Sequence, residues 1–225
     1  MKNNVLHLQA EDAREQDRHL EALKLIEAAF FEYQQDQNYE GLCQALQSRC
    51  LTYKHLFYLA DDQVFAIMAQ KDAEASLAIA KLHDLKNLFG SSYFRLGEIT
   101  MLFDDYSHAV EYYKQSLDHY FGTECEKGDY RYHFGEALYR LGKKKEGKKQ
   151  LKQGLREIQD NSQEVGSFLF HVWESGAHMR LADLLRDDDL SEAKKHLAEA
   201  EDIISSDPKL VIRKRQLELL KREKF

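Results

Sequence analysis

The segment from His171 to His178 is the closest that this sequence comes to a metal-binding pattern. His171, Glu174 and His178 stand at positions i, i+3 and i+7, so they share one face of a helix. Two histidines seven residues apart are separated by about 10 Å along a helix axis, whereas zinc needs ligands within ~2.0–2.2 Å. The three side chains therefore cannot share one ion without help from another segment. We expect them to be structural and expect no metal or other cofactor.

The three cysteines, Cys43, Cys50 and Cys125, are the thiols that could act as nucleophiles. None belongs to a C-x-x-C pair or to a recognisable catalytic motif, and an odd number does not suit a disulfide framework. The serine-hydrolase elbow, the Walker loop and the dinucleotide fingerprint are also missing from the sequence. We expect reduced, buried thiols in a cytoplasmic protein that is not an enzyme.

The lysine-rich segment from Gly142 to Gly154, "GKKKEGKKQLKQG", has only a superficial similarity to a phosphate-binding loop. It lacks the spacing G-x-x-x-x-G-K-[ST] and follows a predicted helix instead of a strand. A solvated helix face explains the six lysines; a site for a polyanion is the alternative.

Composition and charge narrow the class of protein. Charged residues make up 32% and hydrophobic residues 43% of the 225, which argues against disorder. A single proline, Pro208, and 11 glycines favour long helices joined by short turns. Of the net charge of −7, residues 1–112 carry 10 Lys and Arg against 18 Asp and Glu, which disfavours nucleic acid as a partner. No apolar run approaches the ~18 residues of a membrane helix, and the N-terminus lacks a signal-peptide core, so we expect no membrane partner.

Apolar residues recur at helical spacing along most of the chain, as in Leu20, Leu23 and Ile26. Short polar links between consecutive helices imply antiparallel neighbours. We expect Asp104 or Asp105 and Ser191 or Asp189 to cap two of the helices, and Pro208 to lie in the first turn of the last. The ten expected helices span residues 12–35, 39–59, 63–83, 86–103, 105–120, 126–141, 144–159, 162–186, 190–205 and 208–223.

Five of these helices carry a small residue, a large one four positions later and a small one three positions after that. All three positions share one helix face. A small residue there lets a neighbouring helix approach closely, and the large one fills the gap beside it. The pattern indicates a repeated helix pair. The five sets are Ala22, Ile26 and Ala29; Ala73, Leu77 and Ala80; Ala109, Tyr113 and Ser116; Gly147, Leu151 and Gly154; and Ala193, Leu197 and Ala200.

Three helix pairs add matching residues on the first helix. The residues are Tyr93, Leu96, Gly97, Ala109, Tyr113 and Ser116; Phe134, Gly135, Gly147, Leu151 and Gly154; and Leu181, Ala182, Ala193, Leu197 and Ala200. In order and spacing they resemble divergent tetratricopeptide repeats. The resemblance covers most of the chain and is strongest over residues 86–205, although the proline that ends each repeat in that family is absent.

The resemblance implies an all-α, right-handed superhelix of antiparallel helix pairs that forms a single domain over residues 1–225. Residues 208–225 would be its C-terminal capping helix; a membrane-surface or partner helix is the alternative for that segment. The family's fold also implies a concave face lined by the first helix of each pair, where a peptide or protein segment binds.

Basic and acidic residues flank Gly97, Gly135 and Ala182, which occupy equivalent positions on the first helices. Two residues before these positions stand Arg95, His133 and Arg180, and one residue after them stand Glu98, Glu136 and Asp183. Each basic residue is three positions from an acidic one, so the pairs suit intrahelical ion pairs on a solvated surface. Alternatively, the two rows line a groove in which the acidic residues bind the amide N–H groups of a peptide and the basic residues bind its carboxylates. Tyr53 and Tyr139 would supply apolar contact in such a groove.

These features favour a non-enzymatic scaffold that binds a protein or peptide. A regulatory sensor of a small signalling peptide is the alternative, and self-association through the N-terminal helices stays open.

Overall fold

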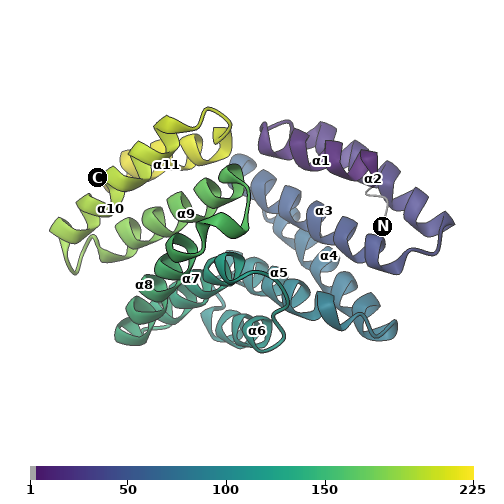
Figure 1. Ribbon diagram of the computed structural model, residues 1–225, viewed down its shortest axis with the longest axis horizontal. Helices are drawn as coiled ribbons and strands as arrows, with labels where there is room; N and C mark the ends of the chain where they lie inside the picture. Colours follow the sequence, from purple (N-terminus) through teal and green to yellow (C-terminus); the bar gives the residue numbers. More distant parts are fainter. Residues whose placement is uncertain (1–3) are drawn as a thin grey trace. The chain divides into compact units, whose positions relative to one another are not determined.

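The computed structural model describes residues 4–225, and all regular structure in that range is helical (Figure 1). The prediction of an all-α chain is therefore confirmed. The chain divides into two compact units, the first ending at Phe121 and the second running from Gly122 to Phe225. The expected single repeat domain stays a prediction.

In the described part of the first unit, six α-helices form three antiparallel pairs. The pairs are α1 (Val5–Glu15) with α2 (His19–Gln35), α3 (Tyr39–Ala60) with α4 (Gln63–Leu82), and α5 (Phe89–Leu102) with α6 (Tyr106–Asp118), and a 3-10 turn, η1 (Lys86–Leu88), precedes α5. The second helix of one pair packs on the first helix of the next, and α3 contacts both α1 and α5. The first helices of the pairs therefore lie in a row.

The second unit repeats this arrangement. It contains α7 (Glu124–Arg140) with α8 (Lys144–Asp160), α9 (Ser167–Leu185) with α10 (Leu190–Ser206), and a last helix, α11 (Val211–Lys224); the 3-10 turn η2 (Ser162–Glu164) precedes α9. Helix α9 contacts α7 on one side and α11 on the other, while α10 also touches α11. The unpaired α11 covers α9 and α10 at the end of the unit.

The N-terminal prediction was wrong, because the helix expected at residues 12–35 is two helices. Helix α1 ends at Glu15 and α2 begins at His19. Between them the backbone of Asp17 turns into the left-handed region, at φ 63°. Aspartate tolerates this conformation better than most residues, so no glycine or proline marks the break.

The start of the last helix was also misplaced. Helix α11 begins at Val211, three residues after Pro208, and Leu210 precedes its first turn. The carboxylate of Asp207 accepts a hydrogen bond from the amide of Lys209 at 3.0 Å, which holds this segment in a turn instead of a helix. The expected caps Asp105 and Asp189 are present on α6 and α10.

One turn geometry recurs between the helices. In it, a residue with positive φ is followed by an amide that donates to the carbonyl five residues back, as in the Schellman motif. These hydrogen bonds run from Arg18 to Ala13, Asn38 to Tyr33, Leu85 to Ala80, Asp105 to Thr100 and Lys143 to Leu138, at 2.8–3.3 Å. The left-handed residues before them are Asp17, Gln37, Asp84, Asp104 and Gly142. The recurrence gives successive helices the same reversal of direction.

The small–large–small positions face the partner helix, as predicted. They lie on the second helices α2, α4, α6, α8 and α10, and the alanines and serine among them are at most 1% exposed: Ala22, Ala29, Ala73, Ala80, Ala109, Ser116, Ala193 and Ala200. The closest approach is between α7 and α8. A Cβ added to Gly147 would lie 2.6 Å from the backbone nitrogen of Tyr139 and 2.7 Å from the carbonyl oxygen of Gly135. These two helices therefore pack backbone against backbone.

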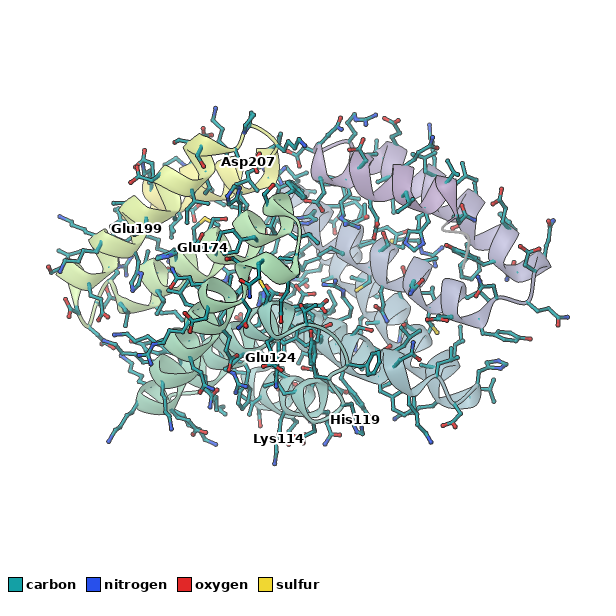
Figure 2. All side chains as sticks on the ribbon, viewed as in Figure 1. Lys114, His119, Glu124, Glu174, Glu199 and Asp207 are labelled. Atoms are coloured by element: carbon teal, nitrogen blue, oxygen red, sulfur yellow. The ribbon has the colours of Figure 1, made fainter. Side chains whose placement is uncertain are left out.

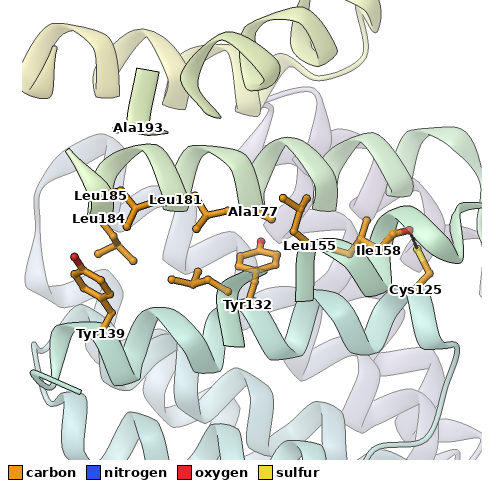
Figure 3. Close-up of a cluster of buried hydrophobic side chains, with 11 residues drawn as sticks. Cys125, Tyr132, Tyr139, Leu155, Ile158, Ala177, Leu181, Leu184, Leu185 and Ala193 are labelled. Atoms are coloured by element: carbon orange, nitrogen blue, oxygen red, sulfur yellow. Dashed lines mark hydrogen bonds between the residues drawn. The ribbon is translucent and has the colours of Figure 1, made fainter. Parts of the chain in front are cut away.

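The core of the second unit fills the space between α7, α8 and α9. The rings of Tyr132 and Tyr139 point from α7 towards α9, where they lie beside Leu181 and Leu184 (Figure 3). The thiol of Cys125 lies at one end of this cluster and donates a hydrogen bond to the Ile158 carbonyl at 3.6 Å. This core sets the spacing of the first helices α7 and α9.

Candidate functional site

The row of first helices in the first unit carries a polar cavity of about 330 Å³. Side chains from α1, α2, α3 and α5 line it, including His7, Arg14, Tyr33, Gln47, Ser48 and Arg95. The cavity therefore joins elements that are far apart in the sequence, and it includes one of the arginines that the sequence pattern singled out.

Arg14 is the most buried charged residue at this cavity, with 7% of its surface exposed. Its Nε donates to the carboxylate of Glu15 at 3.0 Å, and a terminal nitrogen donates to the hydroxyl of Ser48 on α3 at 2.9 Å. Asn4 caps α1 by accepting hydrogen bonds from the first amides of the helix. Helix α1 is thereby fixed so that Arg14 points at α3.

His7 and Tyr33 form the opposite edge of the cavity, with 3.1 Å between Nδ1 of His7 and the Tyr33 hydroxyl. Burial lowers the pKa of His7, and the positive charge of Arg14 lowers it further against the opposing effect of Glu11. His7 is therefore neutral at pH 7. The fixed charges that line the cavity are then those of Arg14, Arg95 and Glu11.

Arg95 and Glu98 form the ion pair that the spacing predicts within α5. Glu98 is 6% exposed, and Lys54 of α3 donates to its other carboxylate oxygen. The guanidinium of Arg95 lies 5.4 Å from the ring centroid of Phe94. The carboxylate thus ties α3 to α5 and holds Arg95 at the cavity wall.

The charged row of the second unit is tied across α7 and α9. Glu136 accepts from Arg140 at 3.0 Å and from Arg180 at 2.8 Å, and Arg140 also reaches Asp183 at 3.0 Å. Burial alone would raise the pKa of Glu136, but the guanidinium groups of Arg180 and Arg140 lower it below its usual value. The acidic row is therefore engaged by arginines from the neighbouring first helix.

The remaining predicted residues lie closer to the cores. His133 has its Nε2 3.9 Å from Asp129 on the same helix. Tyr139 is buried, and its hydroxyl donates to Asp188 while Lys144 lies 5.3 Å from its ring centroid. Tyr53 is half-buried against the core cluster that α3, α4 and α5 share. Each tyrosine therefore packs against the hydrophobic core of the unit to which it belongs.

Sequence reasoning placed Arg95 correctly on the first-helix row but missed Arg14, because α1 itself was missed. A signal for α1 was present: Leu6, Ala10 and Ala13 follow helical spacing and pack the face that meets α2. The ion pair between Glu136 and Arg140 could likewise have been predicted, because the two residues are four positions apart on one helix.

In the part of the chain that is described, the thiols are buried, and two of the histidines that the sequence singled out pair with neighbouring side chains. All three cysteines are buried, and burial raises the pKa of Cys43 and of Cys125 to about 11. His171 pairs with Asp207 at 2.9 Å and His178 with His196 at 2.9 Å. Within residues 4–225, no group of three or more His, Cys, Asp or Glu side chains is arranged to hold a metal ion.

Helices long and apolar enough to cross a membrane are absent from residues 4–225. Comparison with protein-family models found no match, and comparison with the curated proteins found none either.

Proposed function

We propose that the protein is a non-enzymatic scaffold that binds a peptide or protein segment along the row of first helices. The observation that carries this proposal is the polar cavity between α1, α2, α3 and α5, where Arg14 and Arg95 stand on the first helices of the first and third pairs. Polar, partly buried side chains held by ion pairs suit recognition because their geometry is set before the ligand arrives.

The resemblance to tetratricopeptide repeats supports the same proposal. Sequential antiparallel pairs with small residues at the helix contacts are consistent with a helical repeat. In that family the pairs stack as a right-handed superhelix whose first helices line the binding face. We extend this arrangement to the whole chain as part of the proposal, together with a cytoplasmic location and with partners other than nucleic acid or membrane.

The chemistry of the cavity favours a ligand with a carboxylate. The lining carries two arginines and one glutamate, since His7 is neutral at pH 7. Guanidinium groups bind carboxylates through paired, charge-assisted hydrogen bonds. An acidic side chain or a chain end of an extended peptide would add its oxygens beside Arg14 and Arg95.

The absence of an enzymatic step in this proposal rests on the state of the nucleophiles. A thiolate is the reactive form of cysteine. Cys50 is fully buried, and burial raises its pKa far above the usual range. Such thiols stay protonated at neutral pH and are poor nucleophiles.

The proposal is tested by selecting binders from a random peptide library on the immobilised full-length chain and measuring their affinity by fluorescence anisotropy. Arg14→Gln and Arg95→Gln should each weaken binding of the selected peptides about tenfold or more, because each removes a charge-assisted hydrogen bond worth ~1.5–3 kcal/mol. Lys114→Gln, at an exposed position of α6 (Figure 2), is the matched control and should leave affinity unchanged.

Circular dichroism and thermal unfolding verify that each variant is folded. If Arg95→Gln does not fold, Arg95→Lys keeps the charge towards Glu98 while removing the planar fork, and it should still weaken binding. Selected peptides that bind the folded arginine variants as tightly as the Lys114→Gln control, or a library that yields no binder, would overturn the proposal.

A further inference from the structure

His178 on α9 and His196 on α10 face each other inside the second unit. Their Nδ1 atoms are 2.9 Å apart, with 5.0 Å between ring centroids and 52° between ring planes. At this distance one imidazole donates its N–H and the other accepts through a lone pair. Burial lowers the pKa of both rings, so at pH 7 both are neutral and carry different tautomers.

The pair stands in the wall of a cavity of about 650 Å³, lined from α8, α9 and α10. Besides the two histidines, the lining includes Glu192, Lys195 and Glu199 of α10; Glu199 is labelled in Figure 2. His178 is 5% exposed. His196 is partly exposed, so the contact is part-buried and borders a polar space through which protons can arrive.

The charges around the pair do not supply a partner for a proton. The carboxylate of Glu192 is already held by Lys148, at 2.6 Å, and by Lys152, both from α8. No carboxylate among residues 4–225 lies within 4.0 Å of either imidazole in an ion pair.

The remaining groups act on the pair from a distance. Glu192 and Glu199 favour charge on His196, while Lys152 and Lys148 oppose it. Asp189, between α9 and α10, caps α10 through the Glu192 amide, and Lys195 lines the same cavity. Burial is the largest influence on both rings: it lowers the pKa of His196, and, with the neighbouring ring, lowers that of His178 to about 4.

Two protons would break the contact. A first proton can sit on the far nitrogen of the donor ring and leave the N–H···N bond in place. A second occupies the acceptor Nδ1, so that two N–H groups point at each other. We propose that the His178–His196 pair is a proton-sensitive contact, through which acidification loosens α10 from α9 and opens the cavity between them.

The direction of the effect follows from proton linkage. An unfolded histidine takes up its proton near pH 6.5, whereas these two rings resist it in the folded unit. Between pH 6.5 and about 4 the unfolded state binds more protons, so stability falls as pH falls. Above about pH 5 ordinary carboxylates stay ionised, so the interval from pH 6.5 to 5 isolates the histidines.

Trp173, the single tryptophan of the chain, reports on this region because it lies on α9 and packs against the core of the second unit. Urea unfolding of the full chain, followed by its fluorescence in buffer with EDTA, is measured at pH 7.5 and 5.5. The unfolding constant of the wild type should rise about tenfold from His178 alone, since pH 5.5 is one unit below 6.5.

A double variant, His178→Asn with His196→Asn, keeps an amide at each Nδ1 position but cannot take up a proton. It should lose most of this rise. His171→Asn, on the same helix with Asp207 as its partner, is the control and should retain it. An equal rise in the wild type and the double variant would overturn the proposal.

A second measurement does not depend on the double variant folding. In the wild type at pH 5.5, the imidazole shifts of His178, measured by carbon-detected NMR, should keep the values of a neutral ring. The single variants His178→Asn and His196→Asn assign the signals of the two rings. Titration of His178 near pH 6.5 would contradict the proposal.

Discussion

The ring of Tyr113 on α6 fills the space that a side chain at position 97 would need. A Cβ on Gly97 would lie 2.7 Å from Cε1 of Tyr113, and Tyr113 is 1% exposed. The ring is enclosed and has no room to withdraw. The contact brings α5 and α6 together through the smallest and one of the largest side chains, which is why both appear at these positions.

Alanine at Gly97 or at Gly147 should therefore destabilise the fold, and the loss should be larger at Gly147. Gly97→Ala should cost about 1–3 kcal/mol from overpacking, reduced by the ~1 kcal/mol that alanine gains in helix propensity. Gly147→Ala should cost more, because its Cβ would meet backbone atoms of α7 that cannot move aside. Urea unfolding followed by circular dichroism measures both.

Ser107→Ala, at an exposed position of α6, is the control for helix propensity and should stay within ~0.5 kcal/mol of the wild type. A Gly147→Ala protein as stable as this control would show that α7 and α8 do not pack as closely as the structure has them.

Gln37, in the turn between α2 and α3, holds a left-handed backbone at φ 52° with an exposed side chain. This conformation costs an ordinary L-residue ~1–2 kcal/mol, whereas glycine adopts it freely. Gln37→Gly should therefore raise the free energy of unfolding by about 0.5–1 kcal/mol, and the β-branched Gln37→Val should lower it. Thermal unfolding of the two variants side by side checks the opposite signs.

Glu136 should make stability depend on acidity below pH 4.5. Its pKa in the folded chain is lower than the usual 4.5, because Arg180 and Arg140 outweigh burial. Its contribution is therefore complete above pH 4.5 and is lost as pH falls through the lower folded pKa. Glu136→Gln should destabilise the protein by ~1–3 kcal/mol at pH 7 and flatten the decline in acid.

Urea unfolding at pH 7, 4.5 and 3.5 measures this effect. Glu201→Gln removes an exposed ion pair with Lys221 and serves as the control, expected to cost at most ~0.5 kcal/mol. An equal loss in the two variants would contradict the role of the buried carboxylate.

The three thiols should resist modification while the chain is folded. Cys43, Cys50 and Cys125 are fully buried, and burial raises their pKa values. At pH 8 a thiol-specific disulfide reagent should label none of them within an hour, and all three in 6 M guanidinium. Rapid labelling of one thiol without denaturant would show that its helix pair opens locally.

Helix positions follow from the sequence wherever local signals agree. The helix expected at residues 63–83 is observed at Gln63–Leu82, because Asp62 caps its start and Ala73, Leu77 and Ala80 mark the buried face. The break at Asp17 could not be predicted, because an aspartate adopts there the left-handed backbone conformation that glycine usually provides. Arg14 was lost with it, since a residue can be placed on a face only after its helix is recognised.

The sequence by itself determined the helical class, most helix ranges and the small positions at which helices approach, because periodicity and capping act within a few residues. Only the tertiary structure decided which polar groups meet. Arg14 reaches Ser48, 34 residues away, and Arg140 reaches Asp183, 43 residues away. Periodicity assigns a side chain to a helix face, but the partner on the next helix depends on how far the two helices slide along each other. That register is set by the packing of all their side chains together.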